Sequence, residues 1–225
     1  MNERVRKQFN TLSEDYDARR RLLIPCFDEF YNTGIDRLSF PGETPRVLDI
    51  GAGTGIFSES LLSRYPKAKL TLIDFAENML DIAKSKFQDR ADTLYVLDDY
   101  FTHDYGSETF DIVISALSIH HLDSDNKKIF YKNISGLLSD GGEFVNADIA
   151  CSGDPEADAQ DDALWTAFVA DNLGEGEYLD RFMKSKDVDK PSPISDQLLW
   201  LREAGFPTAE CTFKYLNFAV IYAKK

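Results

Sequence analysis

The sequence has few cysteines, few histidines and no long uncharged stretch, and each scarcity excludes a class of protein. Its three cysteines, Cys26, Cys151 and Cys211, are odd in number and far apart, so they suggest neither a disulfide framework nor a CxxC motif. No uncharged run approaches the ~20 residues that cross a bilayer, and the charged N-terminus lacks the apolar stretch of a secretory signal. These features predict a cytoplasmic protein without a membrane partner.

Basic residues are also scarce. The chain has 25 Lys and Arg against 39 Asp and Glu, for a formal charge of −14, and this balance argues against a surface that follows nucleic-acid phosphates. What the chain does have is apolar and aromatic: 43% hydrophobic residues, with 16 Phe and 10 Tyr among 225 residues. A chain of this size and composition buries a sizeable core, which excludes disordered and collagen-like proteins.

Hydrophobic periodicity divides the chain into four segments. Residues 1–40 have apolar positions at helical spacing and predict a helical cap, broken near Pro25. Residues 41–150 alternate short apolar strands with amphipathic helices, which predicts a doubly wound, mostly parallel α/β sheet. Residues 151–194 lose this rhythm and are interpreted as a helical insertion that forms a substrate lid. Residues 195–225 predict a helix and two antiparallel strands that complete a seven-stranded sheet.

The sharpest local motif is the strand-to-helix segment LDIGAGTG. Gly51, Gly53 and Gly55 let the backbone turn tightly and approach a ligand, while the N–H groups of the following helix face it. A glycine-rich turn of this kind can also be only a turn. The spacing is G-x-G-x-G and not the G-x-G-x-x-G of dinucleotide-binding proteins, and Asp49 would disfavour a nearby pyrophosphate. A nucleoside cofactor with an amino group and no phosphate fits this turn better.

Acidic residues stand at the carboxyl ends of the next two predicted strands. Asp74 ends the second strand, nineteen residues after Gly55, where a carboxylate can accept hydrogen bonds from both hydroxyls of a ribose. Asp98, Asp99 and Tyr100 end the third strand. Because parallel strands carry their ligands at their carboxyl ends, three strand ends are expected to converge on one ligand.

This set of motifs resembles the class I S-adenosylmethionine-dependent methyltransferases. The segments LDIGAGTG, LTLIDFAENML, FDIVISALSIHHL and LLSDGGEFV occur in that family's order, and the likeness extends over roughly residues 5–225. It implies a Rossmann-like methyltransferase fold, S-adenosylmethionine as cofactor and a small-molecule methyl acceptor. The cofactor-binding residues that it implies are Tyr16, Arg20, Asp49, Gly51, Ala52, Gly53, Asp74, Phe75, Met79, Asp99, Tyr100 and Ser115.

Individual roles follow from the same resemblance. Asp74 would hold the ribose, the Gly51 carbonyl the methionyl amino group, and Arg20 the methionyl carboxylate. Phe75 or Met79 would press on the adenine. Whether Asp98 or Asp99 contacts the adenine amino group is left open.

Methyl transfer from a sulfonium is an in-line displacement that depends mainly on alignment in a site that excludes water, so no catalytic triad is expected. If the acceptor must lose a proton, His120 and His121 are the candidate bases. The alternative for this pair is hydrogen-bonded packing in a strand-to-helix loop. No spacing of carboxylates compels a metal, since Asp123 or Ser124 is explained more simply as the N-cap of the following helix, and no metal is predicted.

Two other functions stay open at this stage. The closing segment EAGFPTAECTFKYLNFAVIYAKK also resembles carboxy-S-adenosylmethionine synthase, which modifies the cofactor and uses an arginine in the insertion, where Arg181 lies nearby. A protein that binds S-adenosylmethionine without turnover is the second alternative. The sequence does not identify the acceptor, and a homodimer stays open as an assembly.

Overall fold

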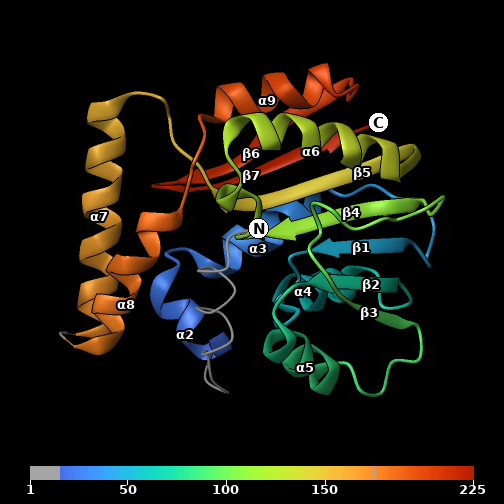
Figure 1. Ribbon diagram of the computed structural model, residues 1–225, viewed down its shortest axis with the longest axis horizontal. Coiled ribbons are helices and arrows are strands. Elements are labelled where there is room, and N and C mark those ends of the chain that lie inside the picture. The colour runs from blue at the N-terminus through green and yellow to red at the C-terminus, as the bar shows by residue number, and fades with distance from the viewer. Residues whose placement is uncertain (1–15, 175) are drawn as a thin grey trace.

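The computed structural model describes residues 16–174 and 176–225, in which seven strands form one sheet in the order β3-β2-β1-β4-β5-β7-β6 (Figure 1). The side chains of Tyr16, Glu177, Tyr178 and Arg181 lie outside this description. The strands are β1 (Arg46–Ile50), β2 (Lys69–Asp74), β3 (Thr93–Leu97), β4 (Phe110–Ala116), β5 (Leu138–Ile149), β6 (Thr208–Tyr215) and β7 (Phe218–Lys224).

The first five strands are mutually parallel, and β7 runs antiparallel to both β5 and β6. This arrangement confirms the predicted mostly parallel sheet with an antiparallel C-terminal pair. The β6–β7 connection is only Leu216 and Asn217, and Leu216 takes a positive φ of 48° to make the turn. Such a short connection forces its two strands to be antiparallel.

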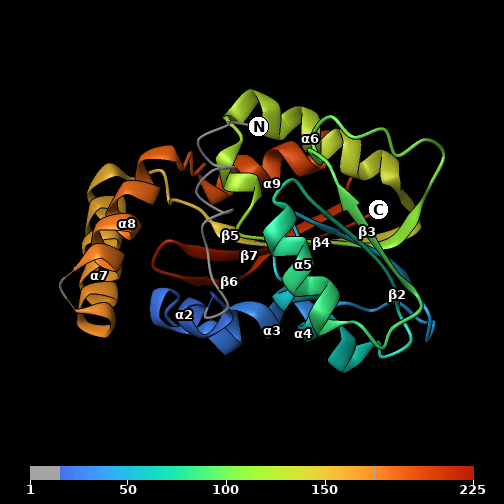
Figure 2. The same cartoon turned by 60° about the horizontal axis from the view of Figure 1, so that its bottom comes forward.

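Helices cover both faces of the sheet (Figure 2). One face carries α3, α4 and α5, and the other carries α6 and α9, while α2, α7 and α8 lie together to one side of the sheet (Figure 1). The helices are α2 (Tyr16–Leu23), α3 (Phe27–Arg37), α4 (Ile56–Arg64), α5 (Glu77–Lys86), α6 (Ser124–Leu137), α7 (Pro155–Leu173), α8 (Glu177–Ser185) and α9 (Ile194–Glu203), with short 3-10 turns η1 (Ile119–His121) and η2 (Lys186–Val188).

Burial on both faces explains the continuous apolar runs of the central strands. Val47, Leu48 and Ile50 of β1 are fully buried, as are Ile112 and Val113 of β4. Strands covered by helices on both sides need apolar residues at successive positions and not only at alternate ones. The loops that follow the carboxyl ends of these strands form the site described below.

The chain breaks between α2 and α3 at Ile24, Pro25 and Cys26, where Cys26 has a left-handed φ of 55°. This confirms the predicted break near Pro25. The part of the predicted cap that falls on residues 1–15 lies outside the described residues. Among the described residues, no helix is both long and apolar enough to cross a membrane.

Candidate functional site

The glycine turn after β1 has the backbone geometry that its three glycines predict. Gly51, Gly53 and Gly55 all have positive φ, at 63°, 55° and 79°. A Cβ at Gly51 would lie 2.0 Å from the Oγ of Ser118, and one at Gly55 would lie 2.6 Å from the Phe87 ring. At Gly53 only Met79 is near, at 3.7 Å, so a side chain there would project toward that residue. The left-handed backbone favours glycine at all three positions, and close packing also requires it at Gly51 and Gly55.

Asp74 ties this turn to the end of β2. One carboxylate oxygen accepts a 2.8 Å hydrogen bond from the Gly53 N–H, and the other accepts one of 2.8 Å from the Ala76 N–H. The residue is 6% exposed. Burial raises the pKa of Asp74 to about 6, although these backbone hydrogen bonds oppose the shift. The carboxylate is thus presented at the site with its position fixed by two N–H groups.

Asp49 lies behind the turn and is more deeply buried, at 1% exposure. Its Oδ2 accepts a 2.6 Å hydrogen bond from the Ser58 hydroxyl, whereas its Oδ1 has no hydrogen-bond partner among the described residues. Burial, together with the charge of Asp74, raises the pKa of Asp49 to about 7. A buried acceptor without a partner is costly, so this atom favours a ligand that brings a donor.

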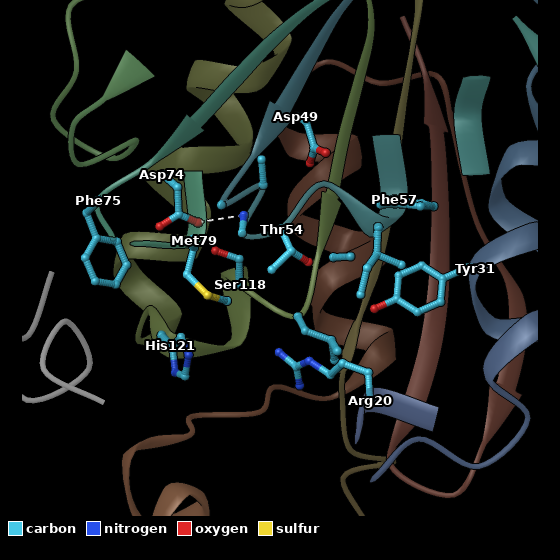
Figure 3. A pocket seen from close by; sticks show the side chains of 16 residues that line it. Arg20, Tyr31, Asp49, Thr54, Phe57, Asp74, Phe75, Met79, Ser118 and His121 are labelled. Atoms are coloured by element: carbon cyan, nitrogen blue, oxygen red, sulfur yellow. Dashed lines mark hydrogen bonds between the residues drawn. The ribbon is translucent and has the colours of Figure 1, made fainter. Parts of the chain in front are cut away.

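A cavity opens in front of the turn and encloses about 580 Å³, including solvent at its mouth (Figure 3). Eight of the predicted cofactor residues line it: Arg20, Asp49, Gly51, Ala52, Gly53, Asp74, Phe75 and Met79. His121, one of the two candidate bases, lines it as well.

Three other predicted cofactor residues do not line this cavity. Ser115 is fully buried and its hydroxyl donates to the Ile50 carbonyl at 2.9 Å. Tyr100 is fully buried too, and its hydroxyl donates to the Ser118 carbonyl at 3.1 Å. Asp99 accepts a 3.0 Å hydrogen bond from the Phe101 N–H. Their cofactor contacts stay predictions.

The predicted cofactor contacts of Asp98 and Tyr16 also stay predictions. Asp98, the alternative to Asp99, pairs with the His103 ring at 2.8 Å, with half of its side chain exposed. Tyr16 belongs to α2, but its side chain lies outside the described part of the chain.

The cavity is also lined by residues that sequence reasoning did not select. Thr54 and Ser118 stand within or beside the quoted motifs, so a closer reading of those motifs could have included them. Tyr31 reaches the cavity from α3, and nothing in its local sequence marks it. The full set of such residues is Tyr31, Thr54, Ile56, Phe57, Ala116, Leu117 and Ser118.

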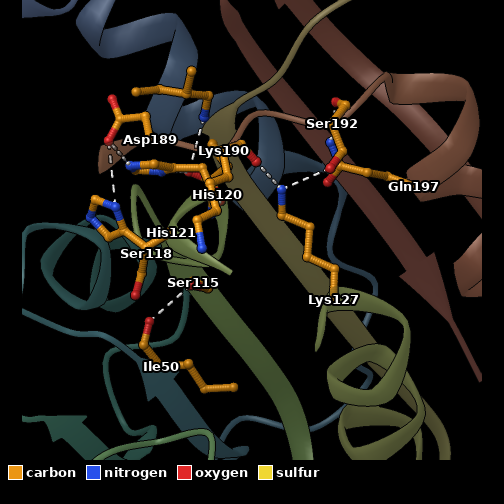
Figure 4. Close-up of polar contacts among 12 residues, drawn as sticks. Ile50, Ser115, Ser118, His120, His121, Lys127, Asp189, Lys190, Ser192 and Gln197 are labelled. Carbon is orange, nitrogen blue, oxygen red and sulfur yellow. Dashed lines mark hydrogen bonds and ion pairs between the residues drawn. The ribbon is translucent and has the colours of Figure 1, made fainter. Parts of the chain in front are cut away.

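The two histidines of η1 have different surroundings (Figure 4). His120 is 4% exposed, and its Nδ1 lies 2.5 Å from Asp148 while its Nε2 lies 3.3 Å from Asp189. Burial would lower the pKa of His120, but the two carboxylates outweigh it and raise the pKa to about 9. For His121, burial and the neighbouring His120 charge lower the pKa to about 3. Of these two candidates, only His121 lines the cavity.

Asp17 holds helix α2 against the glycine turn through a hydrogen bond and an ion pair. One Asp17 carboxylate oxygen accepts a 2.6 Å hydrogen bond from the Thr54 hydroxyl, and the other pairs with Lys86 of α5 at 2.7 Å. The far end of α2 contacts the insertion, because the Trp165 Nε1 of α7 donates to the Leu23 carbonyl at 2.8 Å. These contacts bring Arg20 to the cavity wall.

Comparison with known proteins agrees with this geometry. Residues 47–142 match a family described as a methyltransferase domain. Malonyl-[acyl-carrier protein] O-methyltransferase of Bacillus anthracis is 30% identical over 137 residues, or 61% of this chain and 49% of that protein. Demethylmenaquinone methyltransferase of Chlamydia pneumoniae is 25% identical over 139 residues, or 62% and 58%. The chain spans about half the length of such relatives.

Solved structures share the fold. The DhpI–SAH complex aligns with a TM-score of 0.66 at 15% identity, covering 99% of this chain and 98% of that one. The pyocyanin biosynthetic protein PhzM aligns with a TM-score of 0.68 at 16% identity, covering 98% and 61%. The sheet order and the glycine turn therefore define a Rossmann-like methyltransferase fold. These matches support the class I S-adenosylmethionine-dependent methyltransferase family for this chain.

Proposed function

We propose that this protein transfers a methyl group from S-adenosylmethionine to a small molecule. The observation that carries the proposal is the Asp74 carboxylate, fixed by the Gly53 N–H on the wall of a cavity that also includes Asp49. The curated relatives support a methyltransferase, and the acceptor is not identified by them.

The residues present fit S-adenosylmethionine. Asp74 would accept the ribose hydroxyls, and the apolar side chains of Phe75 and Met79 would flank the adenine. Arg20 would pair with the methionyl carboxylate. The buried Asp49 supports the turn that would receive the methionyl amino group, and its Oδ1 lacks a hydrogen-bond partner among the described residues. A ligand with vicinal hydroxyls, an ammonium group and no phosphate satisfies this set of groups.

When bound, S-adenosylmethionine supplies an electrophilic methyl group on sulfur. The chain's own contribution is alignment and exclusion of water, which can account for most of the acceleration in such a displacement. Leu117, Ser118 and His121 line the cavity after β4, and we place the acceptor beside them. His120, held between Asp148 and Asp189, does not line the cavity.

The insertion formed by α7 and α8 is our candidate for the substrate lid. Its Trp165 ring packs edge-on against Phe182 at 5.0 Å and against Phe218 of β7 at 5.1 Å. Trp165 is 5% exposed, so this contact attaches the insertion to the sheet. Asp189 of the insertion lies 3.4 Å from His121, which lines the cavity, and this end of the insertion would then select the acceptor.

Isothermal titration calorimetry of the purified chain with S-adenosylhomocysteine, beside a titration with NADH, tests the cofactor. We expect one saturable site for the nucleoside and none for the dinucleotide. Absence of that site, or preference for NADH, would contradict the proposal. Incubation with methyl-labelled S-adenosylmethionine and small carboxylic acids, phenols and quinols then tests transfer.

Mass spectrometry of a co-purifying ligand separates the two alternative functions. A carboxylated cofactor would indicate the synthase-like activity, whose candidate Arg181 has a side chain outside the described part of the structure. Bound cofactor without product for any acceptor would indicate a non-catalytic binding protein.

All three cysteines are free of disulfide bonds, which supports a cytoplasmic location. Cell fractionation would test this location.

A further inference from the structure

Two histidines and one aspartate converge beside the cavity in an arrangement that the reaction proposed above does not use. The His120 Nε2 lies 3.3 Å from Asp189 Oδ1, and the His121 Nδ1 lies 3.4 Å from the same oxygen (Figure 4). All three atoms lie within 4.8 Å of one another. The three side chains are between 5% and 12% exposed, so this cluster is not a surface group of charges.

These separations match the spacing of ligands around a transition metal. Histidine nitrogens and carboxylate oxygens bind Zn²⁺ at about 2.0–2.2 Å, which sets neighbouring ligand atoms of a tetrahedral site about 3.4 Å apart. The two measured separations, 3.3 and 3.4 Å, agree with that value. Two imidazoles and one carboxylate form a ligand set for zinc and for ferrous iron.

The groups around His120 orient its imidazole ring for metal binding. Its Nδ1 lies 2.5 Å from Asp148 Oδ1, and its backbone N–H donates to Asp148 Oδ2 at 2.9 Å. A carboxylate on the far nitrogen fixes the ring and directs the other nitrogen at the metal, an arrangement common to metal-binding histidines. Asp148 and Asp189 together supply two negative charges, which a divalent cation between neutral imidazoles would balance.

Hydrogen bonds within the protein hold the segment that carries Asp189 in place without a bound metal. The Lys190 N–H donates to the His120 carbonyl at 2.9 Å. The buried Lys127 of α6 donates to the Ser192 hydroxyl at 2.8 Å and to the Lys190 carbonyl. These contacts hold the residues that follow Asp189 against His120 and α6, which lowers the entropic cost of assembling the site.

We propose that His120, His121 and Asp189 bind one divalent transition-metal ion of the zinc or ferrous class. Because His121 also lines the cavity, a metal ion held by these residues would lie beside the space where we place the acceptor. Three protein ligands with one open position is the pattern of a catalytic and not a structural metal site. The sequence did not predict this site, because Asp189 belongs to the insertion and meets the histidines only in the folded chain.

The test uses the untagged full-length chain, stripped with a chelator and titrated with Zn²⁺ by calorimetry and with Co²⁺ by visible absorption. We expect one equivalent of metal and a Co²⁺ spectrum with nitrogen and oxygen ligands. The variants His121→Ala and Asp189→Asn should each weaken metal binding at least about tenfold, and Asp148→Asn should weaken it about 10–100-fold. The control is His103→Ala, at a partly buried histidine that pairs with Asp98 outside this cluster, and this change should leave the affinity unchanged.

Thermal melting of each variant verifies that it is folded before its affinity is compared. Absence of stoichiometric binding would overturn the proposal, and would mean that the imidazoles and Asp189 simply share protons. Binding that is unchanged in both His121→Ala and Asp189→Asn would overturn it equally, because the metal would then lie elsewhere. No S-adenosylmethionine is present in the titration, so this result is independent of the proposed methyl transfer.

Discussion

Asp74 at the end of β2 accepts a 2.8 Å hydrogen bond from the backbone N–H of Gly53, which lies in the turn after β1. One carboxylate thus fixes the shape of the glycine turn and also lines the cavity in front of it. Substitution of Asp74 should therefore change both cofactor affinity and local stability, and the two effects can be measured separately.

We expect Asp74→Asn to weaken S-adenosylhomocysteine binding by about 2 kcal/mol, or roughly thirtyfold in Kd, because hydrogen bonds to a charged acceptor are lost. The amide also leaves one of the two backbone N–H groups without an oxygen acceptor, so the melting temperature should fall. Calorimetry measures the Kd for S-adenosylhomocysteine, and thermal melting measures the melting temperature. Asp125→Asn is the control, since that side chain is 91% exposed and does not line the cavity. Equal affinity in both variants would place the ribose elsewhere.

Cofactor affinity should fall as the pH is lowered through about 7 to 6. Burial raises the pKa of Asp49 to about 7 and that of Asp74 to about 6, so both carboxylates take up protons in this range. If only the ionised form of Asp74 binds the ribose, Kd should rise about tenfold per pH unit below that value. Calorimetry across this pH range measures the Kd. In Asp74→Asn, the change in Kd near pH 6 should be absent.

Loss of binding at low pH should not reflect unfolding at these two residues. Their native pKa values lie above the unfolded value of 3.8, so the folded state binds protons more tightly than the unfolded state. Their contribution to the free energy of unfolding therefore increases as the pH falls from 7 toward 3.8. Denaturation curves at each pH check this sign, and a parallel loss of stability and binding would contradict it.

Gly53→Ala should affect binding more than stability. The residue has φ of 55°, so alanine there should cost roughly 1–2 kcal/mol of stability, and its methyl group would also point toward the cavity beside Met79. Gly106→Ala is the matched control, with φ of 59° and nothing within 4 Å of the added Cβ. Urea denaturation should show similar losses for both variants, whereas calorimetry should show weaker cofactor binding only for Gly53→Ala.

The buried Lys127 should contribute to stability through the segment before α9. Its side chain is 1% exposed and donates to the Ser192 hydroxyl and the Lys190 carbonyl. Lys127→Met should lower the free energy of unfolding by about 1–3 kcal/mol, because buried acceptors lose their donor. Lys132→Met, at an exposed position of the same helix, should change it by less than about 0.5 kcal/mol. Chemical denaturation measures both, and equal losses would contradict this role for Lys127.

Features set by local sequence could be predicted well. The alternating strands, the glycine turn and the antiparallel end of the chain follow from patterns within a few residues of each other, and the observed sheet confirms them. Asp49 and Asp74 could be placed because a parallel sheet brings its strand ends to one edge. The break before α3 could be placed because Pro25 is incompatible with a continuous helix.

Features set by tertiary contact could not be predicted. Tyr31 reaches the cavity only because α3 packs against the sheet, and no local motif marks it. The difference between His120 and His121 depends on Asp148 and Asp189, which are distant in sequence. Ser115 was selected through the family resemblance, and its hydroxyl donates to the Ile50 carbonyl, so its contact with the cofactor stays a prediction.

The hydrogen bond from Trp165 to the Leu23 carbonyl joins the insertion to helix α2, which carries Arg20 into the cavity. With the roles proposed above for the insertion and for Arg20, this hydrogen bond would link acceptor specificity to cofactor retention. A chimera that exchanges residues 151–194 for those of a relative would alter the anchor of α2 as well. Engineering a new acceptor preference should accordingly retain Trp165, or replace both regions together.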